Sequence, residues 1–298
     1  MRYLPFSPFE PDRPGTARRR FRSIPFRTLV PNLITLGALC AGLSAIKLTV
    51  EGKLDWAVAF IVFAALLDAI DGRIARLIKG TSRFGAELDS LADFVNFGVA
   101  PALMVYFWGL HDLRSAGWIA ALIFAICAGL RLARFNVMID DPNRPAWAAN
   151  FFVGLPAPAG AITVLLPVYV HFLAIPGLGF PAPLTFLYTL AVAFLMVSRL
   201  PVYSGKRLGT RVSPEMVLPV LVLIVVFFAL LLSYPWEVLS TGTVLFLASL
   251  PFGWFSYHAY QRKAAEAAGE GAHAAATGPA SAEIRPEPSD VERPARLN

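Results

Sequence analysis

The sequence predicts an all-α protein, a polytopic membrane helix bundle with about eight transmembrane helices. Its 298 residues are 56% hydrophobic and only 15% charged, with a mean hydropathy of +0.60, whereas a soluble domain is about a quarter charged. Most of the apolar segments approach the about 20 residues that cross a bilayer. In order, these segments cover residues 30–50, 54–78, 87–109, 117–137, 154–174, 182–199, 215–234 and 240–259.

Basic residues gather in alternate connections between these segments. Arginines precede the first segment, further Lys and Arg residues lie in 76–83, 131–144 and 199–211, and Arg262 with Lys263 follow the last segment. Because cytoplasmic loops of membrane proteins are enriched in Lys and Arg, we expect a multi-pass protein of the cell inner membrane with both termini cytoplasmic. The net charge of +6 then reflects orientation, and we expect no nucleic-acid partner.

The two ends of the chain differ from its middle. Residues 1–28 predict a basic cytoplasmic segment, 29–263 a transmembrane catalytic domain, and 264–298 a disordered cytoplasmic tail rich in Ala, Gly, Pro and Glu. The first apolar run follows arginines without a clear cleavage site, so we expect it to remain as an anchor.

One polar stretch, from Asp68 to Asp93, interrupts the apolar pattern. Asp68 and Asp71 are three residues apart, and Asp89 and Asp93 are four apart, so on helices each pair projects from one face. Both pairs lie toward the cytoplasmic ends of the second and third segments. Charges there are costly unless a cation offsets them, so the pattern predicts a functional site.

Carboxylate oxygens are hard ligands, and no His or Cys accompanies them in this stretch. The pattern therefore favours Mg²⁺ or Mn²⁺ over zinc, and four carboxylates suit one ion or a close pair, the arrangement that activates phosphoryl centres. The residues between the pairs fit a phosphate ligand. Gly72 and Ala75 let it approach the helix, Arg76 offers a bidentate fork, and Ser82 and Gly85 open the next helix.

This stretch resembles the signature of the CDP-alcohol phosphatidyltransferase family at every defined position. The resemblance rests on eight residues at fixed spacing, Asp68-x2-Asp71-Gly72-x2-Ala75-Arg76-x8-Gly85-x3-Asp89-x3-Asp93. It implies the family's fold and a direct transfer reaction. In that reaction an alcohol attacks the lipid-proximal phosphorus of CDP-diacylglycerol, and CMP leaves. It also implies a homodimer.

The resemblance also implies a role for each matched residue. Asp68, Asp71 and Asp89 resemble ligands of a site for two Mg²⁺ or Mn²⁺ ions, and Asp93 resembles the residue that both touches a metal and accepts the proton of the alcohol. A Pro-Asn-x-x-Thr element in the first segment is similar to one that the family presents to the nucleotide. The implied contacts of the CDP moiety are Asn32, Thr35, Gly72, Ala75, Arg76, Ser82 and Gly85.

Stretches that extend beyond the signature resemble the membrane-embedded bacterial phosphatidylserine synthases, and they predict L-serine as the acceptor. These stretches are LDSLADFVNFGVAPA from Leu88, RLARFN from Arg131, FFVGLPAP from Phe151 and VSRLPVYSGK from Val197. Arg131, Arg134 and Asn136 are candidate ligands of the serine carboxylate, with Arg134 preferred, although positive-inside placement alone would put arginines there. The sequence departs from many serine synthases at Asn96, where they carry Ser, so glycerol 3-phosphate, inositol and choline stay open as acceptors.

Two functions outside the family are also open. A cation-coupled transporter uses buried carboxylates, but it places them near the bilayer midplane on broken helices, whereas these lie toward one surface. An intramembrane prenyltransferase uses magnesium on a diphosphate, but its two aspartate motifs lie far apart in sequence, unlike the compact unit here.

Overall fold

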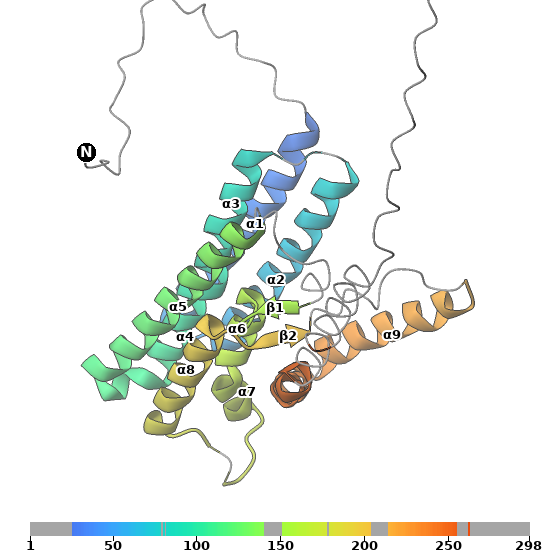
Figure 1. Cartoon of the computed structure of the whole chain (residues 1–298). Helices are drawn as coiled ribbons and strands as arrows, with labels where there is room; N and C mark the ends of the chain where they lie inside the picture. The colour runs from blue at the N-terminus through green and yellow to red at the C-terminus, as the bar shows by residue number, and fades with distance from the viewer. Residues whose placement is uncertain are drawn as a thin grey trace, which may run out of the picture.

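The computed structural model of the chain describes residues 26–78, 80, 82–139, 151–177, 179–203, 214–254 and 262. Within these ranges the protein is a bundle of helices (Figure 1). Its elements in chain order are α1 (Phe26–Val50), α2 (Leu54–Leu77), α3 (Arg83–Asp93), η1 (Phe94–Val99), α4 (Ala100–Val105), η2 (Tyr106–Leu110), η3 (His111–Leu113), α5 (Ser115–Ile139), β1 (Phe151–Val153), α6 (Ala157–Val164), α7 (Leu166–Phe172), α8 (Ala182–Val197), β2 (Pro201–Tyr203) and α9 (Pro214–Ser233). Residues 235–254 are also helical.

The all-α prediction is confirmed, since each of the predicted apolar segments is mostly helical in its described part. Among the described residues, four helices are long and apolar enough to cross a membrane, namely Leu29–Val50, Arg83–Leu113, Ser115–Met138 and Glu215–Ser233. The total of eight spans stays a prediction. Most of the predicted basic segment and the whole of the predicted tail lie outside the described residues.

Two tight connections hold α1, α2 and α3 side by side and place the acidic stretch. Between α1 and α2 the backbone N–H of Lys53 donates to the Leu48 carbonyl at 2.9 Å, and Gly52 takes a φ of +76°, a conformation that costs glycine least. After α2 the N–H of Gly80 donates to the Ala75 carbonyl at 2.9 Å. Ser82 then caps α3, because its Oγ accepts from the N–H of Gly85 at 3.0 Å.

The helix that begins at α3 continues through η1, α4 and η2 with two wider, π-helical turns. The first of these turns precedes Pro101, which has no N–H to donate to the carbonyl of Phe97 four residues earlier. Such local widening re-aims the side chains on either side of it. Gly98 and Gly129 then allow α5 to lie close, because a Cβ on either residue would stand 3.1 Å from Ala128 or from the Phe94 ring.

The core lies between α1, α2, α4, α5, α6, α7 and α8, where Ile61, Phe97, Phe124, Tyr169 and Met196 are fully buried. A short antiparallel ladder, β1 with β2, joins the segments that follow α5 and α8 and was not expected from the sequence. By contrast, α9 runs off to one side of the bundle (Figure 1), and none of its apolar window is buried. Such large exposed apolar surfaces suit a lipid environment.

Candidate active site

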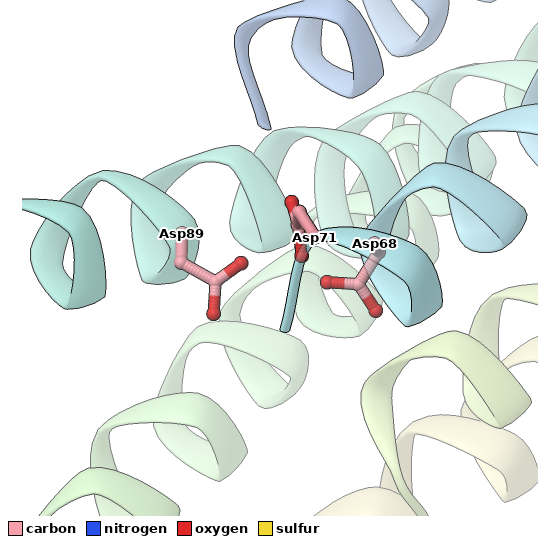
Figure 2. A group of neighbouring side chains, drawn as sticks. All are labelled: Asp68, Asp71 and Asp89. Carbon is pink, nitrogen blue, oxygen red and sulfur yellow. The ribbon is translucent and has the colours of Figure 1, made fainter. Parts of the chain in front are cut away.

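Three of the four motif carboxylates converge between α2 and α3. Each of Asp68, Asp71 and Asp89 offers an oxygen that lies within 4.8 Å of the oxygens from the other two. Figure 2 shows the three side chains pointing into the same space, with two of them coming from α2 and the third from α3. Asp71 and Asp89 stand six residues from the ends of their helices at Leu77 and Arg83, so the connection between the helices sets them level with each other.

This donor set fits a metal ion. The three groups are carboxylates, which are ligands that hard divalent cations prefer, and Asp71 is only 4% exposed. Partly buried carboxylates that lie this close repel one another unless a cation or a proton neutralises them. The triad of Asp68, Asp71 and Asp89 can therefore bind a metal.

Asp93 lies beside the triad and is not one of its members. It follows Asp89 by one helical turn, and its carboxyl group is within hydrogen-bonding reach of Asp68. The motif thus separates into three groups that share a space and a fourth that contacts one of them.

A cavity of about 400 Å³ opens next to the triad, between α1, α2 and α3. Two triad members, Asp71 and Asp89, belong to its wall. Every residue for which the sequence predicted a contact with the CDP moiety also lines it, namely Asn32, Thr35, Gly72, Ala75, Arg76, Ser82 and Gly85. Pro31, Gly80 and Ala86, which were given no such contact, complete the wall.

The two motif glycines have different surroundings. A Cβ on Gly72 would meet no atom within 4 Å, so the α2 backbone faces open space there and a ligand can approach it. A Cβ on Gly85 would stand 2.8 Å from Asn32 Oδ1 and 3.1 Å from Ser82 Oγ. Gly85 therefore also lets α1 pack against the start of α3, a packing role that the sequence analysis missed.

The predicted acceptor residues occupy the C-terminal end of α5, outside the wall of this cavity. Arg131 is 7% exposed, interacts electrostatically with Asp93, and lies over the Phe135 ring at 5.0 Å from its centroid. Arg134 Nη1 donates to the Val197 carbonyl at 2.9 Å, at the end of α8. The two arginines thus lie one turn apart on α5. Arg131 is near Asp93, whereas Arg134 joins α5 to α8.

Asn136 has a partner that the sequence did not suggest. Its Nδ2 donates to Ser90 Oγ at 2.9 Å, which joins α5 to the residue after Asp89. Ser90 occupies a variable position of the motif, so spacing alone gave no sign of this contact. A second missed contact joins Thr35 of α1 to Asp71, with Oγ1 and Oδ2 2.8 Å apart.

Comparison with known proteins identifies the class. The family model described as CDP-alcohol phosphatidyltransferase matches residues 28–255, and the chain belongs to that family.

Relatives whose function is described are named CDP-diacylglycerol--serine O-phosphatidyltransferase. The one from Mycobacterium leprae is 37% identical over 253 residues, which cover 82% of this chain and 82% of the relative. The one from Helicobacter pylori strain 26695 is 33% identical over 223 residues, covering 74% and 88%. The one from Bacillus subtilis is 33% identical over 171 residues, covering 57% and 88%.

Metal binding at the triad predicts a thermal shift. Because an ion that binds only the folded state stabilises it, Mn²⁺ at 100 times its Kd should add about 2.7 kcal/mol to the free energy of unfolding. We expect Mn²⁺ to raise the unfolding temperature of the purified protein in detergent, and Asp71→Asn or Asp89→Asn to remove most of that rise. Glu87→Gln changes an exposed acid of the same helix α3 and is the control. An equal rise in Asp89→Asn and Glu87→Gln would place the ion elsewhere.

Proposed function

We propose that the protein transfers the phosphatidyl group of CDP-diacylglycerol to the hydroxyl of L-serine, giving phosphatidylserine and CMP. The observation that carries this proposal is that the cavity, the carboxylate triad and Asp93 adjoin one another. A nucleotide cradle, a metal-binding cluster and a neighbouring base are the parts that transfer from a CDP-linked donor requires. The names of the relatives support serine as the acceptor.

In this proposal the residues around the cavity bind the CDP-diacylglycerol donor. Gly72 leaves the α2 backbone open to the nucleotide, and Arg76 supplies a guanidinium fork on the same wall for the pyrophosphate. Asp68, Asp71 and Asp89 would hold Mg²⁺ or Mn²⁺, two ions in our proposal, and the chemistry that these ions supply when bound is neutralisation of charge on the phosphoryl oxygens.

Asp93 is the proposed general base. It takes the proton of the serine hydroxyl while the serine oxygen forms a bond to the lipid-proximal phosphorus. The bond from that phosphorus to the bridging oxygen breaks, and CMP leaves with this oxygen and the electron pair. A carboxylate is within reach of such a proton only if it adjoins the phosphoryl site, and Asp93 meets this condition through its contact with Asp68.

For the acceptor we propose Arg131 ahead of Arg134, which reverses the preference drawn from the sequence. Arg131 is buried close to Asp93, where a guanidinium can pair with the serine carboxylate and bring the hydroxyl to the base. Arg134 has a guanidinium nitrogen committed to the end of α8. Asn136, which donates to Ser90 Oγ, would lie at the edge of the same acceptor site.

We further propose that the site and both termini face the cytoplasm from the inner membrane, where serine is available, and that the protein is a homodimer. The distribution of basic residues supports the orientation. Labelling of single introduced cysteines from each side of sealed vesicles tests the orientation, and the protein mass in the detergent particle tests the dimer.

An acceptor panel tests the proposed reaction. In detergent with CDP-diacylglycerol and Mn²⁺ or Mg²⁺, we expect L-serine to release CMP and form phosphatidylserine, measured by chromatography of both products. Glycerol 3-phosphate, inositol and choline in separate reactions are the controls. CMP release with one of these three and not with serine would reassign the acceptor, whereas no CMP release with any of them would remove the enzymatic proposal.

Replacement of the proposed base should stop turnover and spare the donor site. We expect Asp93→Asn to lower kcat by about 100- to 10,000-fold, the range that a positioned base contributes. Binding of CDP, measured by calorimetry with Mn²⁺ present, should change little. Asp112→Asn alters an exposed acid near the far end of the same continuous helix and should keep full activity. Loss of CDP affinity with unchanged turnover in Asp93→Asn would contradict the assigned role.

The two arginines of α5 should give different kinetic results. Arg131→Lys keeps the charge and loses the bidentate fork, so the KM for serine should rise about tenfold or more with little change in CDP affinity, since a charge-assisted hydrogen bond contributes about 1.5–3 kcal/mol. Arg134→Lys should lower the unfolding temperature through the lost α8 contact and leave the KM for serine near its original value. The opposite pattern would restore Arg134 as the serine ligand.

A further inference from the structure

The hydroxyl of Thr35 makes an unusual contact for a threonine inside a helix. Thr35 lies in α1 and is 5% exposed, and its Oγ1 is 2.8 Å from Oδ2 of Asp71 in α2. Two other buried threonines of the described helices bond to their own helix instead. Thr49 donates to the Ala45 carbonyl at 2.8 Å, and Thr189 donates to the Thr185 carbonyl at 2.8 Å.

The hydroxyl of Thr35 donates its proton to the Asp71 carboxylate. Thr35 Oγ1 also lies 3.1 Å from the Pro31 carbonyl, but a hydroxyl carries a single proton. The carboxylate is closer, and hydrogen bonds to a charged acceptor are shorter and stronger than bonds to a neutral one. In addition, the Pro31 carbonyl is the regular acceptor for the backbone N–H of Thr35 within the helix.

Asp71 is the triad member that depends on this support. A carboxylate in a cluster of like charges is pushed toward other rotamers, and a donor that fixes one oxygen opposes that movement. Oδ2 receives the Thr35 hydroxyl, the backbone N–H of Gly72 also bonds to the carboxylate, and the lone pairs that remain are available to an ion. Donors that hold metal-binding carboxylates in this way tune metal affinity, and their loss typically costs 10- to 100-fold.

We infer that Thr35 is a positioning residue whose hydroxyl holds the Asp71 carboxylate in the orientation that binds a divalent cation together with Asp68 and Asp89. This inference rests on the proposed function for the presence of the cation. It assigns the hydroxyl to the metal ligand, whereas the motif in the first segment suggested a contact with the nucleotide. It also gives α1, which supplies no carboxylate to the triad, a direct part in metal binding.

Metal affinity of the protein without nucleotide is the decisive measurement. Full-length protein in detergent is titrated with Mn²⁺, and free Mn²⁺ is followed by electron paramagnetic resonance. Thr35→Val removes the hydroxyl at nearly constant shape and should weaken Mn²⁺ binding about 10- to 100-fold. Thr35→Ser keeps a hydroxyl and should stay within about threefold of the original protein. Thr49→Val is the matched control, a buried threonine of the same helix that bonds only to its own backbone, and it should bind Mn²⁺ normally.

A second titration separates this role from a contact with the nucleotide. With Mn²⁺ held at saturation for each variant, the affinity of Thr35→Val for CDP should match that of the original protein. Weakened CDP binding together with unchanged Mn²⁺ binding would overturn the inference in favour of a nucleotide contact. Equal Mn²⁺ affinity of Thr35→Val and Thr35→Ser would overturn it as well.

Failure of the wider proposal gives a different result. If the original protein binds no Mn²⁺, the metal part of the proposed function fails; if it binds Mn²⁺ and Thr35→Val binds equally well, only the role of Thr35 fails. Should the valine variant aggregate, Thr35→Ala replaces it, since a smaller side chain needs no additional space in the contact between α1 and α2, and the same comparison with Thr35→Ser decides the question.

Discussion

Electrostatic repulsion among carboxylates from two neighbouring helices is the constraint around which the site is built. Two unit charges 4.8 Å apart repel by on the order of 3 kcal/mol at an effective dielectric constant of about 20, and the triad contains three such pairs. Folding must also remove these groups from water, which adds to the cost. A bound cation offsets both costs, so the same geometry that is unfavourable for the chain alone favours the binding of a metal ion.

Contacts with α1 hold the two helices that carry the carboxylates, α2 and α3, in place. The Ser82 cap fixes where α3 begins, and the absence of a side chain at Gly85 lets Asn32 of α1 come close. A few residues further along α1, Thr35 reaches the Asp71 carboxylate. Helix α1 therefore contacts both acidic helices on the wall of one cavity, so a shift of α1 would alter the nucleotide cradle and the triad together.

Sequence reasoning succeeded where spacing along one helix determines geometry. Asp68 and Asp71 share a face because they are three residues apart, and the short connection before Ser82 places Asp89 opposite them, so their convergence followed from the motif. It failed where the surroundings of a side chain depend on how its helix is rotated against the neighbouring helices. Arg131 and Arg134 are also three apart, yet one is buried near Asp93 and the other bonds to the end of α8. The ladder between β1 and β2 and the contact of Thr35 with Asp71 likewise depend on packing between distant segments.

The proposed donor and acceptor residues lie on different helices, and the acidic motif belongs to the donor side. The cradle lies on α1, α2 and α3, so a compact stretch of sequence encodes the binding of the CDP moiety that we propose. The proposed acceptor residues lie on α5, and close packing at Gly98 and Gly129 sets the rotation of this helix against its neighbours. Asp93 stands between the two halves, next to Asp68 on one side and facing Arg131 on the other. On the assignment that we propose, a change of acceptor requires changes on α5 and its neighbours and can leave the acidic motif untouched.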